Sequence, residues 1–213
     1  MSRNQSLLLR ALSALLSYPD TELRDALPEI CGVIRSSHAL KRRTRDDLLR
    51  LAEELAGSDA LDAEGRYVDL FDRGRHTSLN LFEHVHGDGR LRGPAMLQLR
   101  QRYLDAGMEP MSDELPDHLP LMLEYLSCRD EAELRSTVGE AAMILRKIGN
   151  TLLKRHSRYA AVMAALLALG GEKGLDASAP VPPQDDLDRT WEERPAFAPL
   201  EPTAAAGPTR SPT

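Results

Sequence analysis

Leucines at helical spacing fill the first 171 residues of this 213-residue chain, and they constrain its fold more than any other feature. They recur every three or four positions in residues 5–17, and the same pattern returns in residues 40–56 and 130–156. Aromatic residues make up only 4% of the chain, which disfavours β-sheet. The sequence therefore predicts an all-α protein, a single compact domain of several helices that each bury one apolar stripe.

The apolar positions of this pattern define the expected core. Neighbours within one helix are three or four residues apart, so their side chains point to one face. A last, nearly all-apolar helix over residues 157–169 should be buried on most of its surface. Besides that helix, we expect the core to contain Leu8, Leu9, Leu12, Leu15, Leu16, Leu48, Leu51, Leu55, Leu61, Val68, Phe71, Val138, Ala142, Leu145, Ile148 and Leu152.

Short polar residues and glycines mark the expected helix ends. Asp20 and Asp130 are placed to cap helices that reach about Ser37 and His156, because an aspartate side chain accepts hydrogen bonds from the free N–H groups of a first turn. Gly171 is placed to end the last helix. The middle of the chain is expected to contain the end of a helix at Tyr67–Phe71, a loop over 73–77, a short helix capped by Thr77 or Ser78 and ending at 87–89, and helices over 94–106 and 117–127.

The composition changes after Gly171. Eight of the 14 prolines lie in residues 172–213, together with eight acidic and four basic residues. Such a segment buries too little apolar surface to offset the entropy lost on ordering. We therefore expect a helical domain over residues 1–171 and a flexible, acidic, Pro/Ala-rich tail over 172–213, which contains one aromatic island around Trp191.

Charge and cysteine usage exclude several classes of protein. The net charge of the whole chain is −6, and the body without the tail carries only −2, which gives no support to nucleic-acid binding. Cys31 and Cys128 lie far apart and outside any CxxC pair, as expected of reduced thiols. The apolar run at residues 7–9 stops at Arg10, too early for a signal peptide, and no apolar run approaches the ~20 residues that span a bilayer. We expect a soluble, cytoplasmic protein that does not insert into the membrane.

Four of the six histidines lie between Tyr67 and Pro120, which raises the possibility of a metal site. His84 and His86 are two residues apart and would point about 200° away from each other on a helix. They could join His118 in one site only if the backbone between them unwinds. The alternative to a metal site is a set of hydrogen-bonded histidines at helix ends. A metal-dependent helical enzyme that uses His84, His86 and His118 therefore remains an alternative, although no Gly-flanked nucleophile or phosphate-binding loop accompanies them.

The segment Glu114-Leu-Pro-Asp-His-Leu-Pro120 holds two ionisable groups between two prolines. Free N–H groups at a helix start stabilise a carboxylate such as Asp117, and His118 is of a type that titrates near neutral pH. One interpretation is that Asp117 simply caps the helix with His118 packed beside it. The other is that both border a groove that binds a peptide. The residues themselves leave both interpretations open.

Two motifs together resemble a known family. Tyr67-Val-Asp-Leu-Phe71 followed by Glu114-Leu-Pro-Asp-His118 is similar to the paired signature of the redox-enzyme maturation chaperones, a helical family that serves molybdoenzymes. Arg75-His-Thr-Ser-Leu-Asn-Leu-Phe-Glu-His-Val-His-Gly-Asp88 and Arg92-Gly-Pro-Ala-Met96 resemble its nitrate reductase branch, often called the delta subunit. The segments that end at Tyr18-Pro19 and at Leu187-Asp-Arg-Thr-Trp-Glu-Glu193 are similar to that branch too.

This resemblance implies a chaperone, not an enzyme, that carries no cofactor of its own. Its implied partner is the N-terminal segment of the catalytic (alpha) subunit of nitrate reductase, which it would bind in the cytoplasm. It would keep the apoenzyme competent for insertion of the molybdenum cofactor before membrane docking, an unfolded-protein-binding role in nitrate assimilation. Molybdenum cofactor delivery proteins are a second implied class of partner. A structural subunit of the mature reductase complex remains the alternative outside the chaperone class.

The expected peptide site combines an apolar wall with a polar rim, as suits an amphipathic helix. The resemblance assigns six positions, and the sequence between the two motifs suggests Phe82 and Glu83 in addition. The family pattern has proline directly after its motif glutamate, whereas this chain has Leu115 there. The predicted wall is Tyr67, Leu70, Phe71 and Phe82, and the predicted rim is Glu83, Glu114, Asp117 and His118.

Overall fold

The computed structural model describes residues 1–86, 92–109 and 114–178. Within these ranges all regular structure is helical, apart from one isolated β-bridge between Asn80 and His118, so the predicted all-α fold is confirmed. The helices are α1 (Arg3–Leu15), α2 (Thr21–Ser36), α3 (Arg42–Gly57), α4 (Ala60–Tyr67), the π-helical turn η1 (Val68–Asp72), α5 (Glu83–His86), α6 (Arg92–Asp105), α7 (Leu119–Ser127), α8 (Glu131–Lys154) and α9 (Ala160–Gly170).

The core follows the predicted leucine pattern. The five leucines predicted in α1 are each 0% exposed, and the predicted core residues of α3 and α8 are buried as well. Asp20 caps α2 by accepting a hydrogen bond from the Leu23 N–H at 2.9 Å, and Asp130 caps α8 through the Glu133 N–H at 2.8 Å. Both predicted caps are confirmed, and helix α2 continues without a break through Pro28.

Leu61 and Val68 are corrections to the predicted core, because the Leu61 side chain is 77% exposed and Val68 is only partly buried. Helix α4 packs through Ala63 and Tyr67, which are four residues apart and share one face. Leu61 precedes Ala63 by two residues and therefore points about 200° away from that face. The leucine spacing identified the helix correctly, but its core stripe is set by a small residue and a tyrosine.

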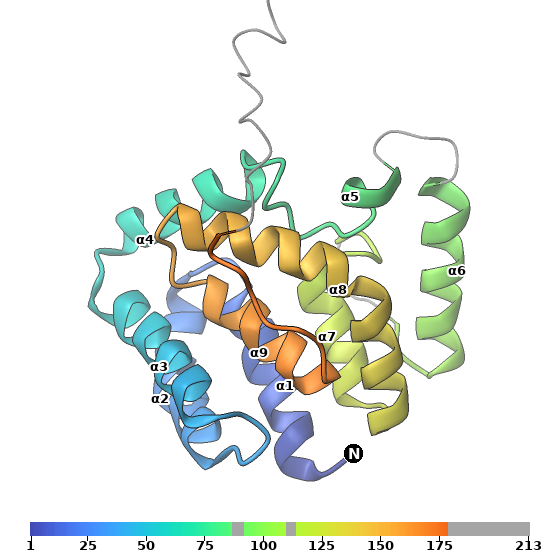
Figure 1. Cartoon of the computed structure of the whole chain (residues 1–213), viewed down its shortest axis with the longest axis horizontal. Helices are drawn as coiled ribbons and strands as arrows, with labels where there is room; N and C mark the ends of the chain where they lie inside the picture. Colours follow the sequence, from blue (N-terminus) through green and yellow to red (C-terminus); the bar gives the residue numbers. More distant parts are fainter. Residues whose placement is uncertain (87–91, 110–113, 179–213) are drawn as a thin grey trace, which may run out of the picture. The chain divides into compact units, whose positions relative to one another are not determined.

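Helices α8 and α9 form the most closely packed pair and lie beside each other in Figure 1. A Cβ on Gly170 would lie 2.4 Å from Val138 Cγ1, so a glycine is required where the end of α9 meets α8. The next residue, Gly171, ends α9 with a left-handed conformation (φ 75°), as its sequence position predicted.

Residues 172–178 continue along α8 after the end of α9. Leu175 packs against the core and lies over Gly149, where an added Cβ would be 2.4 Å from Leu175 Cδ2. Arg146 forms an ion pair with Glu172 at 3.7 Å. Residues Met1–Ala179 make up one compact unit. The predicted flexible tail from there to the end of the sequence, Trp191 included, lies outside the described residues.

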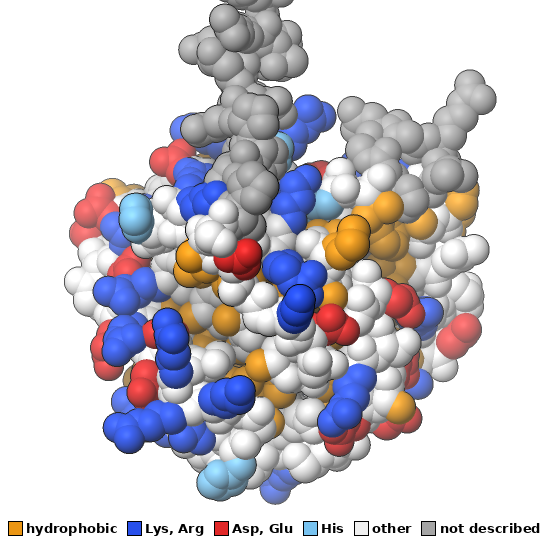
Figure 2. Space-filling view, in the orientation of Figure 1, with side chains coloured by type: hydrophobic (Ala, Val, Ile, Leu, Met, Phe, Trp, Pro, Cys, Tyr) orange, Lys and Arg blue, Asp and Glu red, His pale blue; other side chains and the backbone are white. Residues whose placement is uncertain are grey.

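The face of the unit that carries α3 and α8 mixes both signs of charge. Figure 2 shows Lys and Arg side chains interspersed with Asp and Glu across this face. Several are paired, for example Arg158 with Glu54 at 2.8 Å. In the part of the chain that the structure describes, no helix is both long and apolar enough to cross a membrane.

Candidate functional site

The first sequence motif lies where an α-helix changes into a π-helix. Helix α4 ends at Tyr67, and the motif continues in the π-helical turn η1, so its predicted helical conformation is confirmed. The Tyr67 hydroxyl donates to the Leu16 carbonyl at 2.9 Å, and its ring lies 4.9 Å from that of Phe71. Burial raises the pKa of Tyr67, so the phenol stays protonated. A π-helical turn frequently marks a functional site, because it displaces side chains from the regular spacing.

A tight contact fixes the exit of η1. A Cβ on Gly74 would lie 2.1 Å from the Leu70 carbonyl oxygen, and the Thr77 hydroxyl donates a hydrogen bond to the same oxygen. Thr77 therefore secures the end of the π turn and does not cap a helix. The predicted short helix is wrong at its start, because α5 begins only at Glu83.

Residues 79–82 pair with the second motif instead of forming a helix. The Leu119 N–H donates to the Leu79 carbonyl at 2.9 Å, and the Leu81 N–H donates to the Asp117 carbonyl at 3.1 Å. The Asp117 carboxylate accepts a third bond, from the Phe82 N–H at 2.8 Å. We call this set of contacts the Asp117 clamp. It joins two segments that are about 35 residues apart in the chain.

The clamp corrects both interpretations of Asp117. Its side chain is 0% exposed, so it does not lie on a rim, and it does not cap α7 because its carboxylate is bonded to Phe82. His118 takes the N-cap position of α7 without a side-chain capping bond. Burial raises the pKa of Asp117, although the Phe82 N–H and the charge of Arg92 act in the opposite direction.

His118 and Glu114 meet at the edge of the clamp. Nδ1 of His118 lies 3.3 Å from a carboxylate oxygen of Glu114, and the two side chains are 16% and 55% exposed. Burial lowers the pKa of His118, while the carboxylates of Glu114 and Asp117 oppose that shift. The imidazole is therefore neutral at neutral pH and presents a polar edge beside an exposed carboxylate.

These residues border a cavity of about 440 Å³, which we call the motif pocket. It brings together four of the eight predicted site residues, Tyr67, Phe71, Glu114 and His118. Its other lining residues are Ser17, Tyr18, Asp72, Ser78, Leu79, Asn80, Pro120, Leu121 and Glu124.

The remaining predicted site residues lie elsewhere. Leu70 is buried in the core, and Phe82 is partly buried against it. Glu83 forms an ion pair with Arg92 at 3.3 Å. Partial burial acts to raise the pKa of Glu83, but hydrogen bonds from Ser78 and Asn80 and the charge of Arg92 outweigh it and lower the pKa. None of these residues, nor Asp117, lines the motif pocket.

The histidines do not form a metal site in the described part of the chain. Nε2 of His84 lies 2.9 Å from the Ser78 carbonyl, and burial lowers the pKa of this histidine. Among the described side chains, no three His, Cys, Asp or Glu residues are grouped as metal ligands. The side chain of His86 lies outside the described residues. His84 therefore acts as a hydrogen-bonding partner of the segment that the Asp117 clamp holds.

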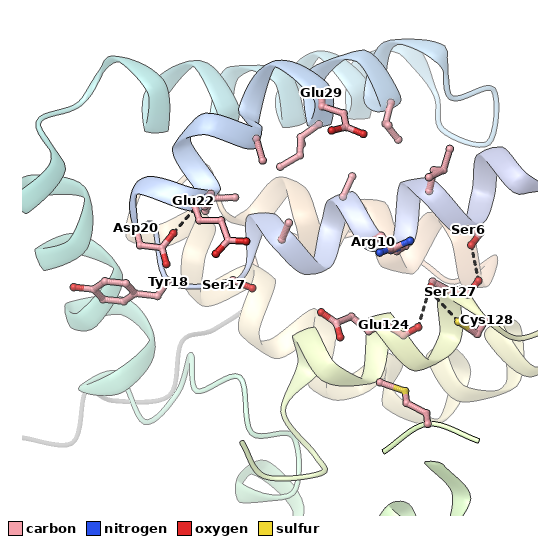
Figure 3. Close-up of a pocket in the computed structure, with 18 residues that line it drawn as sticks. Ser6, Arg10, Ser17, Tyr18, Asp20, Glu22, Glu29, Glu124, Ser127 and Cys128 are labelled. Carbon is pink, nitrogen blue, oxygen red and sulfur yellow. Dashed lines mark hydrogen bonds between the residues drawn. The ribbon is translucent and has the colours of Figure 1, made fainter. Parts of the chain in front are cut away.

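A larger cavity of about 960 Å³ opens between α1, α2 and α7, and we call it the α1 groove (Figure 3). Its floor contains Ala11 and Ala14 of α1, where small side chains leave room between the helices. Figure 3 shows Glu22 and Glu29 on α2 and Glu124 on α7, on opposite sides of α1. Ser17, Tyr18 and Glu124 also line the motif pocket, so the two cavities adjoin at these residues.

The α1 groove was not predicted from the sequence. Two signals were present, namely alanines that share a helical face at positions 11 and 14, and glutamates seven residues apart at positions 22 and 29. Neither signal identifies a cavity without knowing how α1, α2 and α7 pack. The combined surface is apolar at its floor and acidic at its edges, which suits an amphipathic helix with basic residues.

Comparison with known proteins points to one family. A family model described as the nitrate reductase delta subunit matches residues 20–165. The nitrate reductase molybdenum cofactor assembly chaperone NarJ of Escherichia coli strain K12 is 41% identical over 191 residues, which cover 85% of this chain and 80% of that protein. A second protein of that strain, NarW, is 34% identical over 194 residues and covers 87% of this chain and 81% of its own.

The fold agrees with this relationship. A crystal structure from Archaeoglobus fulgidus, assigned as a redox enzyme maturation protein, superposes with a TM-score of 0.55 at 20% identity and covers 78% of this chain and 91% of its own. The predictions of a family of chaperones and not of enzymes, and of its nitrate reductase branch, are confirmed by the matched relatives. The chain belongs to the nitrate reductase delta subunit family.

Proposed function

We propose that this chain is a molybdenum cofactor assembly chaperone that binds the N-terminal segment of the nitrate reductase catalytic subunit in the cytoplasm. The observation that carries this proposal is a pair of adjoining cavities, the motif pocket and the α1 groove, which together combine an apolar floor with an acidic edge. Family membership supports nitrate reductase as the client enzyme, and the two cavities offer a surface for one of its segments.

The acidic edge is available for a partner. No hydrogen bond or ion pair links the carboxylates of Glu22, Glu29 or Glu124 to another described side chain. Lys or Arg residues on a bound helix would pair with them, while the apolar face of that helix covers Ala11 and Ala14. Apolar burial supplies most of the affinity, and the edge charges add specificity and a faster association.

This binding mode suggests how the chaperone assists assembly. A segment that occupies the cavity is withheld from its final position in the reductase, so the apoenzyme stays open to cofactor insertion and does not dock at the membrane early. The chain holds a peptide and performs no chemistry on it. In this proposal, separate proteins bind the complex of chaperone and apoenzyme and deliver the molybdenum cofactor.

Calorimetry with a synthetic peptide of the client's N-terminal segment tests the binding step. Ala14→Trp fills the α1 groove from its floor and is expected to weaken binding at least tenfold. Met143→Trp is the matched control, because Met143 lies on α8, is 80% exposed and does not line the groove. Absence of saturable binding to the wild-type chain at tens of micromolar would refute the proposal, as would equal affinities for the two variants.

A second experiment separates a chaperone from a structural subunit of the mature complex. Nitrate reductase produced without this protein should contain markedly less molybdenum per catalytic subunit. A purely structural subunit could be omitted without that loss. The metal content of purified reductase, measured with and without the chain, therefore decides between the two alternatives.

A further inference from the structure

Two hydrogen bonds between α1 and α7 give the direction of the α1 groove. Ser6 of α1 donates to the Ser127 carbonyl of α7 at 2.6 Å, and Ser13 donates to the Pro120 carbonyl at 2.8 Å. Helices α1 and α7 are therefore antiparallel, with Ser6 and Cys128 at one end of the α1 groove. Ser17 and Tyr18 lie at the other end, where the groove adjoins the motif pocket.

The two ends of the groove differ in charge. At the Tyr18 end, Glu22 and Glu124 are followed in the motif pocket by Asp72 and Glu114, the last beside the neutral His118. Asp20 adds a fifth carboxylate, which is engaged in capping α2. Figure 3 shows the Glu124 carboxylate pointing toward Ser17 from a position between Ser17 and Arg10.

The Cys128 end is close to neutral. Its charged lining residues are Arg10 on α1 and Glu29 on α2, and no ion pair or hydrogen bond links the Arg10 guanidinium to another described residue. Ser6, Leu7 and Val33 complete this end of the groove. An unpaired guanidinium on the wall of an otherwise acidic cavity calls for a negative group in the bound molecule.

A helical peptide carries the complementary pair of charges. Its N-terminal end has free N–H groups and a positive dipole, to which a chain N-terminus adds an ammonium group, and its C-terminal end has free carbonyls and a negative dipole. We propose that the client segment binds antiparallel to α1, with its N-terminal end in the motif pocket and its C-terminal end at Arg10 and Cys128. Arg10 then determines the orientation of the bound helix.

The dimensions of the groove set the length of this segment. Ser6 on α1 and Ser17, just beyond its end, are eleven residues apart, which corresponds to about 16 Å along the helix axis. A bound helix of about three turns covers the α1 groove, and the residues before it enter the motif pocket. Glu22 and Glu29 lie about 10 Å apart along α2, so they match basic residues about seven positions apart in the client.

The inference rests on the proposed function, and cross-linking from two ends tests it separately. The chain has two cysteines, of which Cys128 lines the groove and Cys31 does not. Cys31→Ser leaves Cys128 as the single thiol at the Arg10 end. Adding Cys128→Ser and Asp72→Cys moves the single thiol to the motif pocket.

Each single-thiol variant is incubated with a synthetic peptide of the client's N-terminal segment that carries a bromoacetyl group at one end. We expect Cys128 to react at least tenfold faster with the C-terminally labelled peptide, and Asp72→Cys to react faster with the N-terminally labelled one. The reverse pattern, or equal rates at both thiols, would overturn the orientation. Failure of either peptide to bind the wild-type chain by calorimetry would instead refute the proposed function.

Substitution of Arg10 gives a second readout. Arg10→Glu should weaken an unlabelled peptide with a free C-terminal carboxylate about tenfold and one with a C-terminal amide less. In the Cys31→Ser background it should also reduce the preference of Cys128 for the C-terminal label. An Arg10→Glu chain that keeps both the affinity and the preference would show that Arg10 does not set the orientation.

Discussion

The helical body and the Tyr67–Pro120 segment of this molecule are stabilised in different ways. Helices α1, α8 and α9 bury leucines and alanines at regular spacing, and their structure follows from apolar burial. In the Tyr67–Pro120 segment, a π-helical turn and the Asp117 clamp hold the chain through a small number of polar contacts. The body therefore provides a stable framework, whereas the shape of the motif pocket depends on individual hydrogen bonds.

Removing a core side chain should cause the largest loss of stability, without a change in peptide binding. Leu12→Ala deletes a 0% exposed side chain and should lower the free energy of unfolding by about 2–5 kcal/mol in urea denaturation. Leu61→Ala, at a 77% exposed position, is the control and should change it by less than about 0.5 kcal/mol. The affinity of the Leu12→Ala chain for the peptide, measured where the chain is folded, should stay unchanged. A large loss of affinity would contradict the assignment of Leu12 to the framework alone.

Breaking the Asp117 clamp should cause an intermediate loss of stability, confined to the segments that the clamp joins. Asp117→Ala removes the carboxylate to which the partly buried Phe82 N–H donates, and should lower the free energy of unfolding by about 1–3 kcal/mol. The Phe82 amide should exchange faster with solvent in this variant, while amides of α8 and α9 keep their protection. Uniformly faster exchange would mean that the clamp supports the whole fold and not the pocket alone.

The raised pKa of Asp117 gives this clamp a pH signature. Between the ordinary aspartate pKa of about 3.9 and its raised folded value, the native state binds more protons than the unfolded state. Stability contributed by Asp117 therefore falls as pH rises through that window. Asp117→Asn retains an acceptor without the charge, so its stability relative to the wild type should increase from pH 4 to pH 7 in urea titrations. A constant difference would contradict the assigned shift.

Protonation of His118 should lower the affinity for the peptide, and this effect should be smaller than those of the two preceding substitutions on stability. Because burial lowers its pKa, His118 is neutral at pH 7, and it gains a proton only below its ordinary pKa of about 6.5. That proton costs stability in the folded state and adds positive charge beside Glu114. Affinity for a basic peptide should be constant from pH 8 to 7 and fall a few-fold by pH 5.5 in calorimetry. His118→Gln should remove most of this fall, and an unchanged profile would exclude His118 as its source.

Neutralising a glutamate of the acidic edge should have the smallest of these effects, a modest loss of affinity for the peptide. Glu22→Gln and Glu29→Gln should each weaken the peptide about two- to fivefold at low salt and less at high salt, because exposed charges are screened. Glu131→Gln on α8 is the matched control, since Glu131 does not line either cavity. A salt-independent loss would indicate a packing role for these side chains.

Features that depend on neighbours in sequence could be predicted, and those that depend on distant partners could not. The leucine stripes, the caps at Asp20 and Asp130 and the helical conformation of Tyr67–Phe71 are local, and the structure confirms them. Asp117 looked like a helix cap because capping is judged from the next three residues, whereas its partner Phe82 lies 35 positions earlier.

The candidate site likewise has one part that could be predicted from sequence motifs and one part that could not. Tyr67, Phe71, Glu114 and His118 could be selected from their motifs and do meet in one cavity. The α1 groove could not be predicted, because its volume arises from how three helices are spaced and not from any one of their sequences. The groove is nevertheless the larger part of the proposed binding surface.

The proposed function requires that the motif pocket and the α1 groove form one binding site. Amide chemical-shift mapping with one synthetic client peptide tests this most directly. We expect residues 6–18, from α1 through the turn after it, and residues 114–121 to shift together along a single 1:1 titration curve, while α9 does not respond. Shifts confined to one of the two cavities, or two curves with different midpoints, would contradict it.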